Sequence, residues 1–142
     1  MANTLGIIKP DAVRRKLVGS IVSKIEKDGL VLRGMKVVHL TRQRAEEFYA
    51  IHEDKPFYKS LVKFMTSGPI VVIVLGGHGA IERWRELMGN TDPAKAKYNT
   101  IRREFGTSIE KNAVHGSDSP ATAKTEVAFF FDSAEILPKE LG

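Results

Sequence analysis

Residues 70–75 read Ile70-Val71-Val72-Ile73-Val74-Leu75. The run shows no alternation of apolar and polar side chains, which is typical of a strand that is buried on both faces. It has the length of a strand and is far shorter than the roughly 20 apolar residues that a membrane-spanning helix needs. The sequence therefore predicts a sheet that is covered on both faces where this strand runs.

Apolar residues at helical spacing flank this strand on both sides. Thr41 opens the first such stretch, and a glycine-rich turn at residues 76–79 precedes the last. The apolar stripes are formed by Ala45, Phe48, Tyr49 and His52, by Phe57, Leu61, Phe64 and Met65, and by Ile81, Trp84, Leu87 and Met88. We expect a pair of helices before the strand and one helix after it.

The N-terminal part of the chain has the pattern of a strand followed by a helix. Residues 5–8 form a short apolar run, and Asp11 is suited to cap the helix that follows, because its carboxylate can accept hydrogen bonds from the free amides of a first turn. Apolar side chains at helical spacing over residues 17–25 give this helix one buried face. Gly29 suits the left-handed position after a helix.

Two further strands complete the predicted sheet. Residues 30–40 are rich in Leu and Val and predict a strand with a bulge at Gly34. Residues 90–125 are mostly polar, with only short helical spacings, and residues 127–131 predict the last strand. A long irregular stretch inside a compact domain is usually functional or disordered, and the variety of residue types in this one favours function.

The predicted order matches the β-α-β-β-α-β plan of ferredoxin-like folds. We expect an α/β protein of the α+β sandwich type, with an antiparallel sheet, an inserted helical pair and a long active-site loop region before the last strand. The chain has 142 residues, close to the roughly 150 of one domain, so residues 1–142 are predicted to form a single domain.

Composition excludes several functional classes. The absence of cysteine excludes a disulfide scaffold, a thiolate metal site and cysteine catalysis. The N-terminus lacks the charged lead and long apolar stretch of a signal peptide, so we expect a cytoplasmic protein without a membrane segment. The formal charge is +5, and the excess of basic residues lies in residues 1–60. Composition leaves three interpretations open: a nucleic-acid surface, cations that help to hold a small polyanion, or a solvated surface.

The polar stretch contains one group of residues that is suited to chemistry. It reads Asn112-Ala113-Val114-His115-Gly116-Ser117-Asp118-Ser119. A glycine after His115 leaves room around the imidazole, and Ser117 and Asp118 offer hydrogen bonds that could fix its tautomer. A nucleophilic histidine needs one bare ring nitrogen while the other is held. The residues alone favour such a histidine no more than a loop histidine held by its neighbours.

This octapeptide resembles the active-site signature of nucleoside diphosphate kinases. Other segments are similar to motifs of that family and follow in the family's order, from about Thr4 to Phe131. They are Lys9-Pro10-Asp11, Phe57-Tyr58 before Leu61-Val62-Lys63, Ser67-Gly68-Pro69, Gly89-Asn90-Thr91 and Thr100-Ile101-Arg102. The resemblance implies ping-pong transfer of the γ-phosphoryl group of a nucleoside triphosphate, such as ATP or GTP, to a nucleoside diphosphate.

The resemblance also assigns roles near the reacting group. His115 would be the nucleophile and would become a phosphohistidine, while Glu126, at the start of the predicted last strand, and Ser117 would orient its ring. Lys9 would contact the ribose hydroxyls and the reacting phosphate. Tyr49 would support Lys9 or His115, although an ordinary core aromatic is an equal interpretation.

The remaining roles concern the nucleotide. Arg85, Thr91 and Arg102 resemble a phosphate-binding trio, with His52 as a further phosphate contact, and guanidinium groups suit phosphate oxygens. By the same resemblance, Asn112 and Lys9 would form hydrogen bonds with the ribose hydroxyls and the reacting phosphate. Phe57 and Ile109 would enclose the base. Leu61 is either the floor of the pocket or an ordinary core residue. Mg²⁺ would bridge the nucleotide phosphates, with few or no protein ligands.

The family resemblance further implies a homo-oligomer, either a tetramer or a hexamer. The chain departs from the family at Tyr98-Asn99, where Pro-Gly is common, and at Lys111, where arginine is common. The first departure concerns the loop before Arg102. The C-terminal end, Leu137 to Gly142, lacks the longer tail of some members.

Two other functions compete with this interpretation. A basic ferredoxin-like domain can bind nucleic acid, but the Lys/Arg-Gly-Phe/Tyr-Gly/Ala-Phe spacing of an RNA-recognition sheet is missing, so nucleic acid is not a required partner. An inactive family member that serves as an interaction protein is the other alternative. A P-loop kinase is excluded because no Gly-x-x-x-x-Gly-Lys-Ser/Thr segment occurs.

Overall fold

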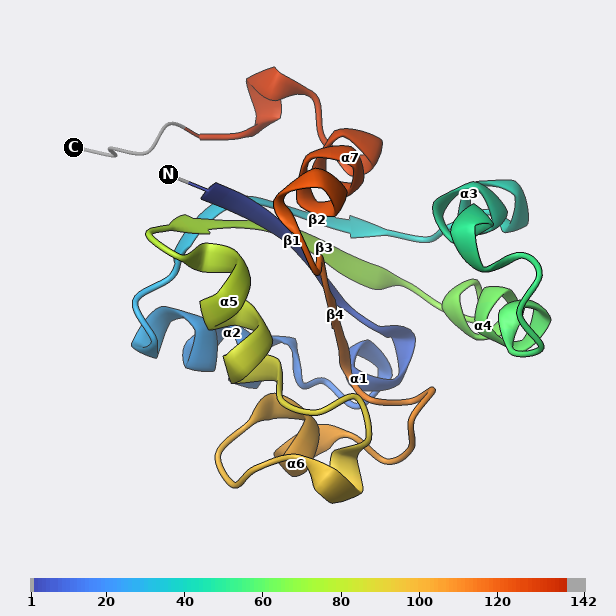
Figure 1. The fold of residues 1–142 in the computed structure, drawn as a ribbon, viewed down its shortest axis with the longest axis horizontal. Coiled ribbons are helices and arrows are strands. Elements are labelled where there is room, and N and C mark those ends of the chain that lie inside the picture. Colours follow the sequence, from blue (N-terminus) through green and yellow to red (C-terminus); the bar gives the residue numbers. More distant parts are fainter. Residues whose placement is uncertain (1, 138–142) are drawn as a thin grey trace.

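The computed structural model of the chain describes residues 2–137, so the last five residues of the predicted domain and of the C-terminal tail lie outside the described residues. Within that range one antiparallel sheet runs through the molecule in the order β2-β3-β1-β4 (Figure 1). Its strands are β1 (Ala2–Ile8), β2 (Val31–Val38), β3 (Ile70–Gly77) and β4 (Val114–Gly116). The antiparallel sheet that the sequence predicts is confirmed.

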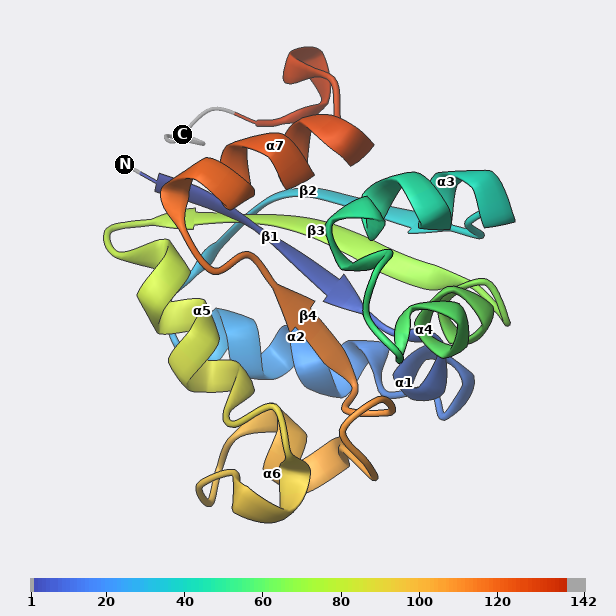
Figure 2. The ribbon, with the colours of Figure 1, turned by 45° about the vertical axis from the view of Figure 1, so that its right-hand side comes forward.

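Strand β3 has the predicted burial on both faces, and every residue of it is buried. Its side chains alternate between two apolar clusters. Val71, Ile73 and Leu75 join the cluster on the side of helices α2 (Val18–Lys27) and α5 (Ala80–Met88). Ile70, Val72 and Val74 join the cluster on the side of helices α3 (Arg42–Phe48), α4 (Tyr58–Met65) and α7 (Pro120–Phe130). Figure 2 shows α3 and α7 on one side of the sheet and α2 and α5 on the other.

The predicted β-α-β unit is present, with one change in its helix. Instead of one helix there are two, α1 (Pro10–Arg14) and α2. Asp11 does not cap either of them: it lies inside the first turn of α1, and its Oδ2 accepts a hydrogen bond from the amide of Ala113 at 3.2 Å. Proline at the start of α1 removes one of the free amides that a cap would otherwise satisfy.

The glycine and bulge predictions are confirmed. Gly29 follows α2 with φ +89°, a conformation that glycine adopts without strain. In β2 the pairing with β3 shifts between Leu32 and Gly34, so Arg33 is the extra residue of a bulge.

The predicted helical pair is α3 and α4, joined by the short 3-10 turn η1 (Ala50–His52). The hydroxyl of Thr41 caps α3 by accepting a hydrogen bond from the amide of Arg44. The pair places Phe57, the residue that precedes α4, at one end of the sheet, where the pocket described below opens.

The prediction of a last strand at residues 127–131 is wrong. Residues 120–130 form helix α7, and the strand that completes the β-α-β-β-α-β order is β4, which carries His115. Ser119 and Thr122 form a capping box, and Pro120 occupies the first helical turn, so the helix has a defined start. Val127 and Phe131 are four residues apart and both pack in the apolar cluster on the α7 side of the sheet.

The segment between α5 and β4 contains more local structure than the sequence predicts. It holds the turn η2 (Pro93–Lys95) and the helix α6 (Ile101–Phe105), and η3 (Ser133–Glu135) follows α7. Asn99, in the unusual Tyr98-Asn99 pair, has φ +72°. Asparagine is the non-glycine residue that tolerates this region best, so the chain keeps a left-handed turn before Arg102. No described helix is long and apolar enough to cross a bilayer.

Candidate active site

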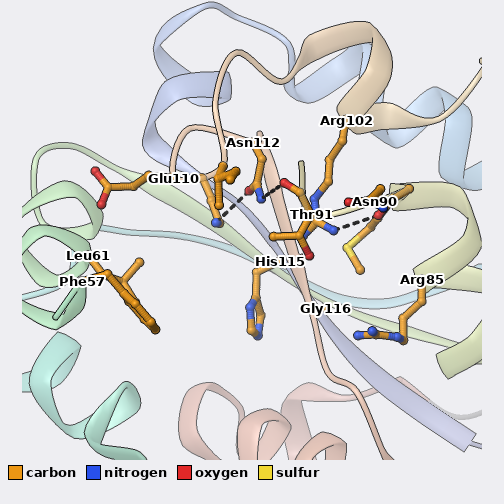
Figure 3. A pocket seen from close by; sticks show the side chains of 14 residues that line it. Phe57, Leu61, Arg85, Asn90, Thr91, Arg102, Glu110, Asn112, His115 and Gly116 are labelled. Atoms are coloured by element: carbon orange, nitrogen blue, oxygen red, sulfur yellow. Dashed lines mark hydrogen bonds between the residues drawn. The ribbon is translucent and has the colours of Figure 1, made fainter. Parts of the chain in front are cut away.

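A cavity of about 680 Å³ lies at the end of the sheet where β4 and the segment before it meet α4 and α5 (Figure 3). Its walls come from four parts of the chain that are distant in sequence. Nine of the predicted site residues line it: Lys9, Phe57, Leu61, Arg85, Thr91, Arg102, Ile109, Asn112 and His115. Met88, Gly89, Asn90, Glu110 and Gly116 complete the lining.

His115 stands in the middle of the cavity, between Phe57 and Arg85 (Figure 3). It is the central residue of β4 and pairs with Ile7 of β1, so the sheet fixes its backbone. Its Nε2 lies 3.0 Å from Oε1 of Glu126 on α7. An ionised carboxylate can only accept, so in the neutral imidazole Nε2 carries the proton and Nδ1 keeps its lone pair.

Ser117 contacts Glu126 and reaches the imidazole of His115 only through it. Its hydroxyl is buried and donates to the same Oε1 of Glu126 at 2.8 Å, and no described contact joins it to the ring of His115. Glu126 is therefore held by two donors, although it belongs to a helix and not to the predicted strand. The arrangement gives the imidazole one tautomer and one orientation.

Two details around His115 differ from the sequence prediction. Asp118 contacts Thr122, whose hydroxyl donates to its Oδ1 at 2.8 Å, so it stabilises the start of α7 and does not hold the imidazole. Gly116 leaves space for Trp84 and Met88: a Cβ at this position would lie 2.6 Å from Trp84 Nε1 and 2.5 Å from Met88 Cε. The glycine is thus needed for packing under the strand.

Lys9, Asn112 and Thr91 form a chain of hydrogen bonds along one wall (Figure 3). Lys9 Nζ donates to Oδ1 of Asn112 at 2.8 Å, and Nδ2 of Asn112 donates to the carbonyl of Thr91 at 3.0 Å. Lys9 and Asn112 are buried, so these contacts fix the ammonium group against the cavity. The main-chain amide of Lys9 also donates to the carbonyl of Ala113, which ties α1 to the strand of His115.

Burial, followed by the positive charge of Arg102, lowers the pKa of Lys9 to about 8, although the negative charges of Asp11 and Glu110 act in the opposite direction. Since the ordinary lysine pKa is 10.5, the unfolded chain binds more protons than the folded chain between these two values. Burying the charged lysine therefore destabilises the fold below pH 8, and this effect fades as the pH rises toward 10.5. An anionic ligand beside Lys9 would offset this destabilisation.

Arg102 joins two walls of the cavity. Its Nη1 donates to the carbonyl of Gly89 and its Nη2 to the carbonyl of Val114, both at 2.9 Å. Its Nε is buried and has no hydrogen-bond partner among the described residues. Burial, and then the nearby charge of Arg85, lowers the pKa of Arg102, which still stays charged at neutral pH. Two guanidinium groups this close in one cavity are suited to a ligand with several negative charges.

Four predicted site residues lie outside the cavity lining: Glu126 and Ser117, whose contacts are described above, and Tyr49 and His52. Tyr49 is buried in the core, and its hydroxyl has no hydrogen-bond partner among the described residues, so it does not support Lys9 or His115 through such a bond. Burial, with a smaller contribution from Glu126, raises its pKa. His52 packs against Phe57, with 5.5 Å between the ring centroids, and so lies beside the cavity.

Sequence reasoning missed two residues that shape the site. Phe48 packs edge-on against His115, with 5.7 Å between ring centroids and 72° between ring planes. Its only sequence signal is its place beside Tyr49 in an apolar helical stripe. Glu110, which lies between Ile109 and Lys111 in the sequence, also lines the cavity. No sequence pattern pointed to it, because a carboxylate is not expected where anions bind. Among the described residues, no group of three or more His, Asp or Glu side chains could hold a metal ion.

Comparisons with known proteins agree on one family. A family model described as nucleoside diphosphate kinase matches residues 2–136. Nucleoside diphosphate kinase of Desulfosudis oleivorans is 53% identical over 137 residues, which cover 96% of this chain and 99% of the relative. That of Thiobacillus denitrificans is 55% identical over 133 residues, covering 94% of each chain.

Solved structures of similar proteins give the same result. Nucleoside diphosphate kinase of Aquifex aeolicus has a TM-score of 0.93 and 42% identity, with 96% of this chain and 99% of that chain covered. The halophilic enzyme of Halobacterium salinarum, solved in complex with CDP, has a TM-score of 0.94 and 40% identity, with 98% of this chain and 93% of that chain covered.

Proposed function

Since this chain belongs to the nucleoside diphosphate kinase family, we propose that it transfers the γ-phosphoryl group in two steps through a phosphohistidine on His115. The activity itself, from nucleoside triphosphate to nucleoside diphosphate, follows from relatives that match nearly the whole chain. The observation that supports the assignment of the nucleophile is the position of the imidazole, in the centre of the cavity and held at Nε2 by Glu126.

The free nitrogen defines the chemistry that we propose. Nδ1 of His115 attacks the γ-phosphorus, the bond between that phosphorus and the bridging oxygen breaks, and the nucleoside diphosphate leaves with the electron pair. The imidazole becomes positively charged, and the carboxylate of Glu126 stabilises that charge through the Nε2 proton. In the second step an oxygen of the second diphosphate's terminal phosphate attacks the phosphohistidine, and Nδ1 regains its lone pair.

The cations of the cavity would hold the phosphates. Phosphoryl transfer needs positioning and charge neutralisation more than covalent help, and Arg85 and Arg102 face the space beside His115 from α5 and α6. Lys9 adds a third cation, and Thr91 offers a hydroxyl on the same wall. His52, which packs on Phe57 outside the lining, is a weaker candidate for this role.

The other end of the cavity would hold the nucleoside. Lys9 and Asn112, already joined by a hydrogen bond, offer polar atoms to the ribose hydroxyls. Phe57 and Ile109 both line the cavity and are both exposed, so a flat base would have access to the two side chains, with Leu61 beside Phe57. Stacking on an aromatic ring tolerates every base, which suits an enzyme that accepts several nucleotides.

Members of this family generally use the magnesium complex of the nucleotide, and the cavity is compatible with that form. Its lining offers amide and hydroxyl oxygens of Asn90, Asn112 and Thr91 but only one carboxylate, that of Glu110. Magnesium prefers oxygen ligands and keeps several waters, so the phosphates themselves would carry it. When bound it neutralises phosphate charge, in addition to the cations of the chain.

We also propose that residues 1–142 act as one domain in a cytoplasmic homo-oligomer, a tetramer or a hexamer. The feature that supports assembly is β2, which lies at the edge of the sheet. Met35 and Val37, two residues apart on this strand, are 46% and 71% exposed. Exposed apolar side chains on an edge strand are uncommon in monomers, because such a strand can pair with another chain. Sedimentation velocity would measure the assembly.

The test of the nucleophile is the phosphoenzyme itself. Incubation with γ-labelled ATP and Mg²⁺, without an acceptor, should leave one acid-labile and base-stable phosphate per chain. In a His115→Ala variant the label and the exchange activity should both disappear. Phosphorus NMR of the denatured phosphoenzyme would distinguish substitution at Nδ1 from substitution at Nε2.

The matched control is His78→Ala, because His78 is an exposed histidine in the turn before α5, outside the cavity. It should keep the label and the activity. A labelled and active His115→Ala variant would show that another residue is the nucleophile.

A further inference from the structure

Glu110 is an unexpected residue in this cavity. The proposed ligand carries several negative charges, and a carboxylate among its contacts repels it. Even so, Glu110 is half-buried and lines the same space as Lys9, Arg102 and His115. Its negative charge favours the charged form of Lys9, and its position in the lining also makes it available to the ligand.

The side chain of Glu110 is held in place by a residue of α4. Ser60 donates from its hydroxyl to Oε2 of Glu110 at 2.8 Å. Ser60 lies on the helix that follows Phe57, and Glu110 follows Ile109 in the chain. Their hydrogen bond therefore joins the two segments that supply Phe57 and Ile109, the residues proposed to enclose the base.

Figure 3 shows the carboxylate on the α4 side of the cavity, with Leu61 and Phe57, and away from Arg85. It thus lies at the nucleoside end of the site and not at the phosphate end. One of its oxygens, Oε2, accepts from Ser60 and keeps a second lone pair, and no described residue donates to the other, Oε1. A fixed carboxylate oxygen with free lone pairs at this end of the site is an acceptor for N–H groups of a base.

We propose that Glu110 is a specificity-determining residue of this chain and that it favours guanine nucleotides. This inference rests on the proposed function, because it needs the base to lie between Phe57 and Ile109. The carboxylate accepts hydrogen bonds from N1–H and the 2-amino group of guanine, while Ser60 keeps it in position.

The chemistry of the bases explains the choice of guanine. Its N1–H and 2-amino group are adjacent donors on one edge, and a carboxylate is well suited to accept two parallel N–H bonds. Adenine and cytosine each place a ring-nitrogen acceptor beside their amino group, and uracil places a carbonyl on each side of N3–H. These acceptors repel a carboxylate, so Glu110 disfavours the three bases that it does not bind.

The test measures phosphorylation of the enzyme by GTP, ITP and ATP in single-turnover experiments. ITP keeps N1–H but lacks the 2-amino group, so the expected order of kcat/KM for the native chain is GTP, then ITP, then ATP. In Glu110→Gln the ratio of GTP to ATP should fall about tenfold, the size expected for loss of a charged hydrogen bond. ITP should lose less than GTP. An unchanged ratio would overturn the proposal.

Two further variants separate base recognition from charge and packing. Glu86→Gln removes one negative charge from an exposed position on α5, outside this cavity, and should leave the ratio unchanged. Ser60→Ala keeps the carboxylate but frees it, and should lower the ratio less than Glu110→Gln does. If the ratio of GTP to ATP falls equally in Glu86→Gln, the effect is one of net charge, and the proposal is overturned.

The same measurement distinguishes this inference from the proposed function. If the native chain forms the His115 phosphoenzyme with all three nucleotides but shows no preference for GTP, only the role of Glu110 is wrong. If no nucleotide phosphorylates His115, the proposed function fails and the assignment of Glu110 fails with it.

Discussion

Lys9 shows how one side chain connects stability with binding. Its ammonium group is buried, it donates to Asn112, and burial lowers its pKa to about 8. The free protein therefore holds a cation that its surroundings disfavour. A bound phosphate group would favour the charged form of Lys9, so nucleotide binding and protonation of this lysine are coupled.

This coupling predicts the pH dependence of the reaction. Above pH 8 the free enzyme loses the Lys9 proton, so log kcat/KM should fall with a slope of about −1 per pH unit. In Lys9→Arg the guanidinium stays charged, so that variant should lose the inflection near pH 8 even if its overall rate is lower. A full pH profile of both proteins checks this. If the inflection near pH 8 persists in Lys9→Arg, a group other than Lys9 causes it.

The residues of the site were predictable from sequence to different degrees. His115, Lys9, Asn112 and the arginines belong to motifs that resemble a family, and the fold brings them to one cavity. Glu110 and Phe48 could not be found in this way, because their roles depend on contacts with Ser60 and His115 across the fold. Pairwise contacts between distant segments leave no local pattern.

At the level of elements, the misplaced last strand has a physical cause. Residues 127–131 are apolar and aromatic, which favours a strand by propensity. The structure places them at the end of a helix because Ser119 and Thr122 start one with a capping box and the apolar side chains fit the surface of the sheet. The Ser119-Pro120 pair was the available sequence signal, since serine at the cap with proline after it is typical of a helix start.

The turn before α6 offers a prediction about backbone strain. Asn99 has φ +72°, which a β-branched residue adopts only at a cost of about 1–2 kcal/mol. Asn99→Val should lower the free energy of unfolding by that amount, while Asn99→Gly should be close to neutral. Urea denaturation followed by circular dichroism measures both.

The neighbouring residue provides the control for this prediction. Tyr98 is 86% exposed and its φ is not positive, so Tyr98→Val should change the free energy of unfolding by less than about 0.5 kcal/mol. If Asn99→Val is no worse than Tyr98→Val, the left-handed turn is not under strain.

At the scale of the whole molecule, the sheet has one open edge with apolar side chains, the strand β2. Val37→Lys places a charge on this edge, and a charge blocks strand-to-strand association. We expect this variant to sediment as a smaller species than the native chain, and its thermal unfolding temperature should fall at equal protein concentration.

Ile51→Lys is the matched control for the edge-strand prediction. Ile51 is 79% exposed but lies in η1, outside the edge strand β2, so the substitution of lysine there should leave the sedimentation coefficient unchanged. Native behaviour of Val37→Lys would mean that the chain does not assemble through this strand.

The sequence predicted the sheet and its two covering layers because β3 and the helical stripes carry strong periodic patterns. It could not predict how the chain assembles, since the exposure of Met35 and Val37 depends on β2 being an edge strand. Strand order is a property of the whole fold and cannot be predicted from the pattern of any one segment.

The proposed nucleophile and the residues proposed to recognise the base lie on different parts of the scaffold. His115 belongs to a strand that is hydrogen-bonded to the central sheet, whereas Glu110 and Ser60 belong to a loop and a helix at its margin. Substitutions at the margin can therefore alter which nucleotide is preferred without disturbing the geometry of phosphoryl transfer. Base preference can then evolve by substitution at this margin while the strand that carries His115 stays unchanged.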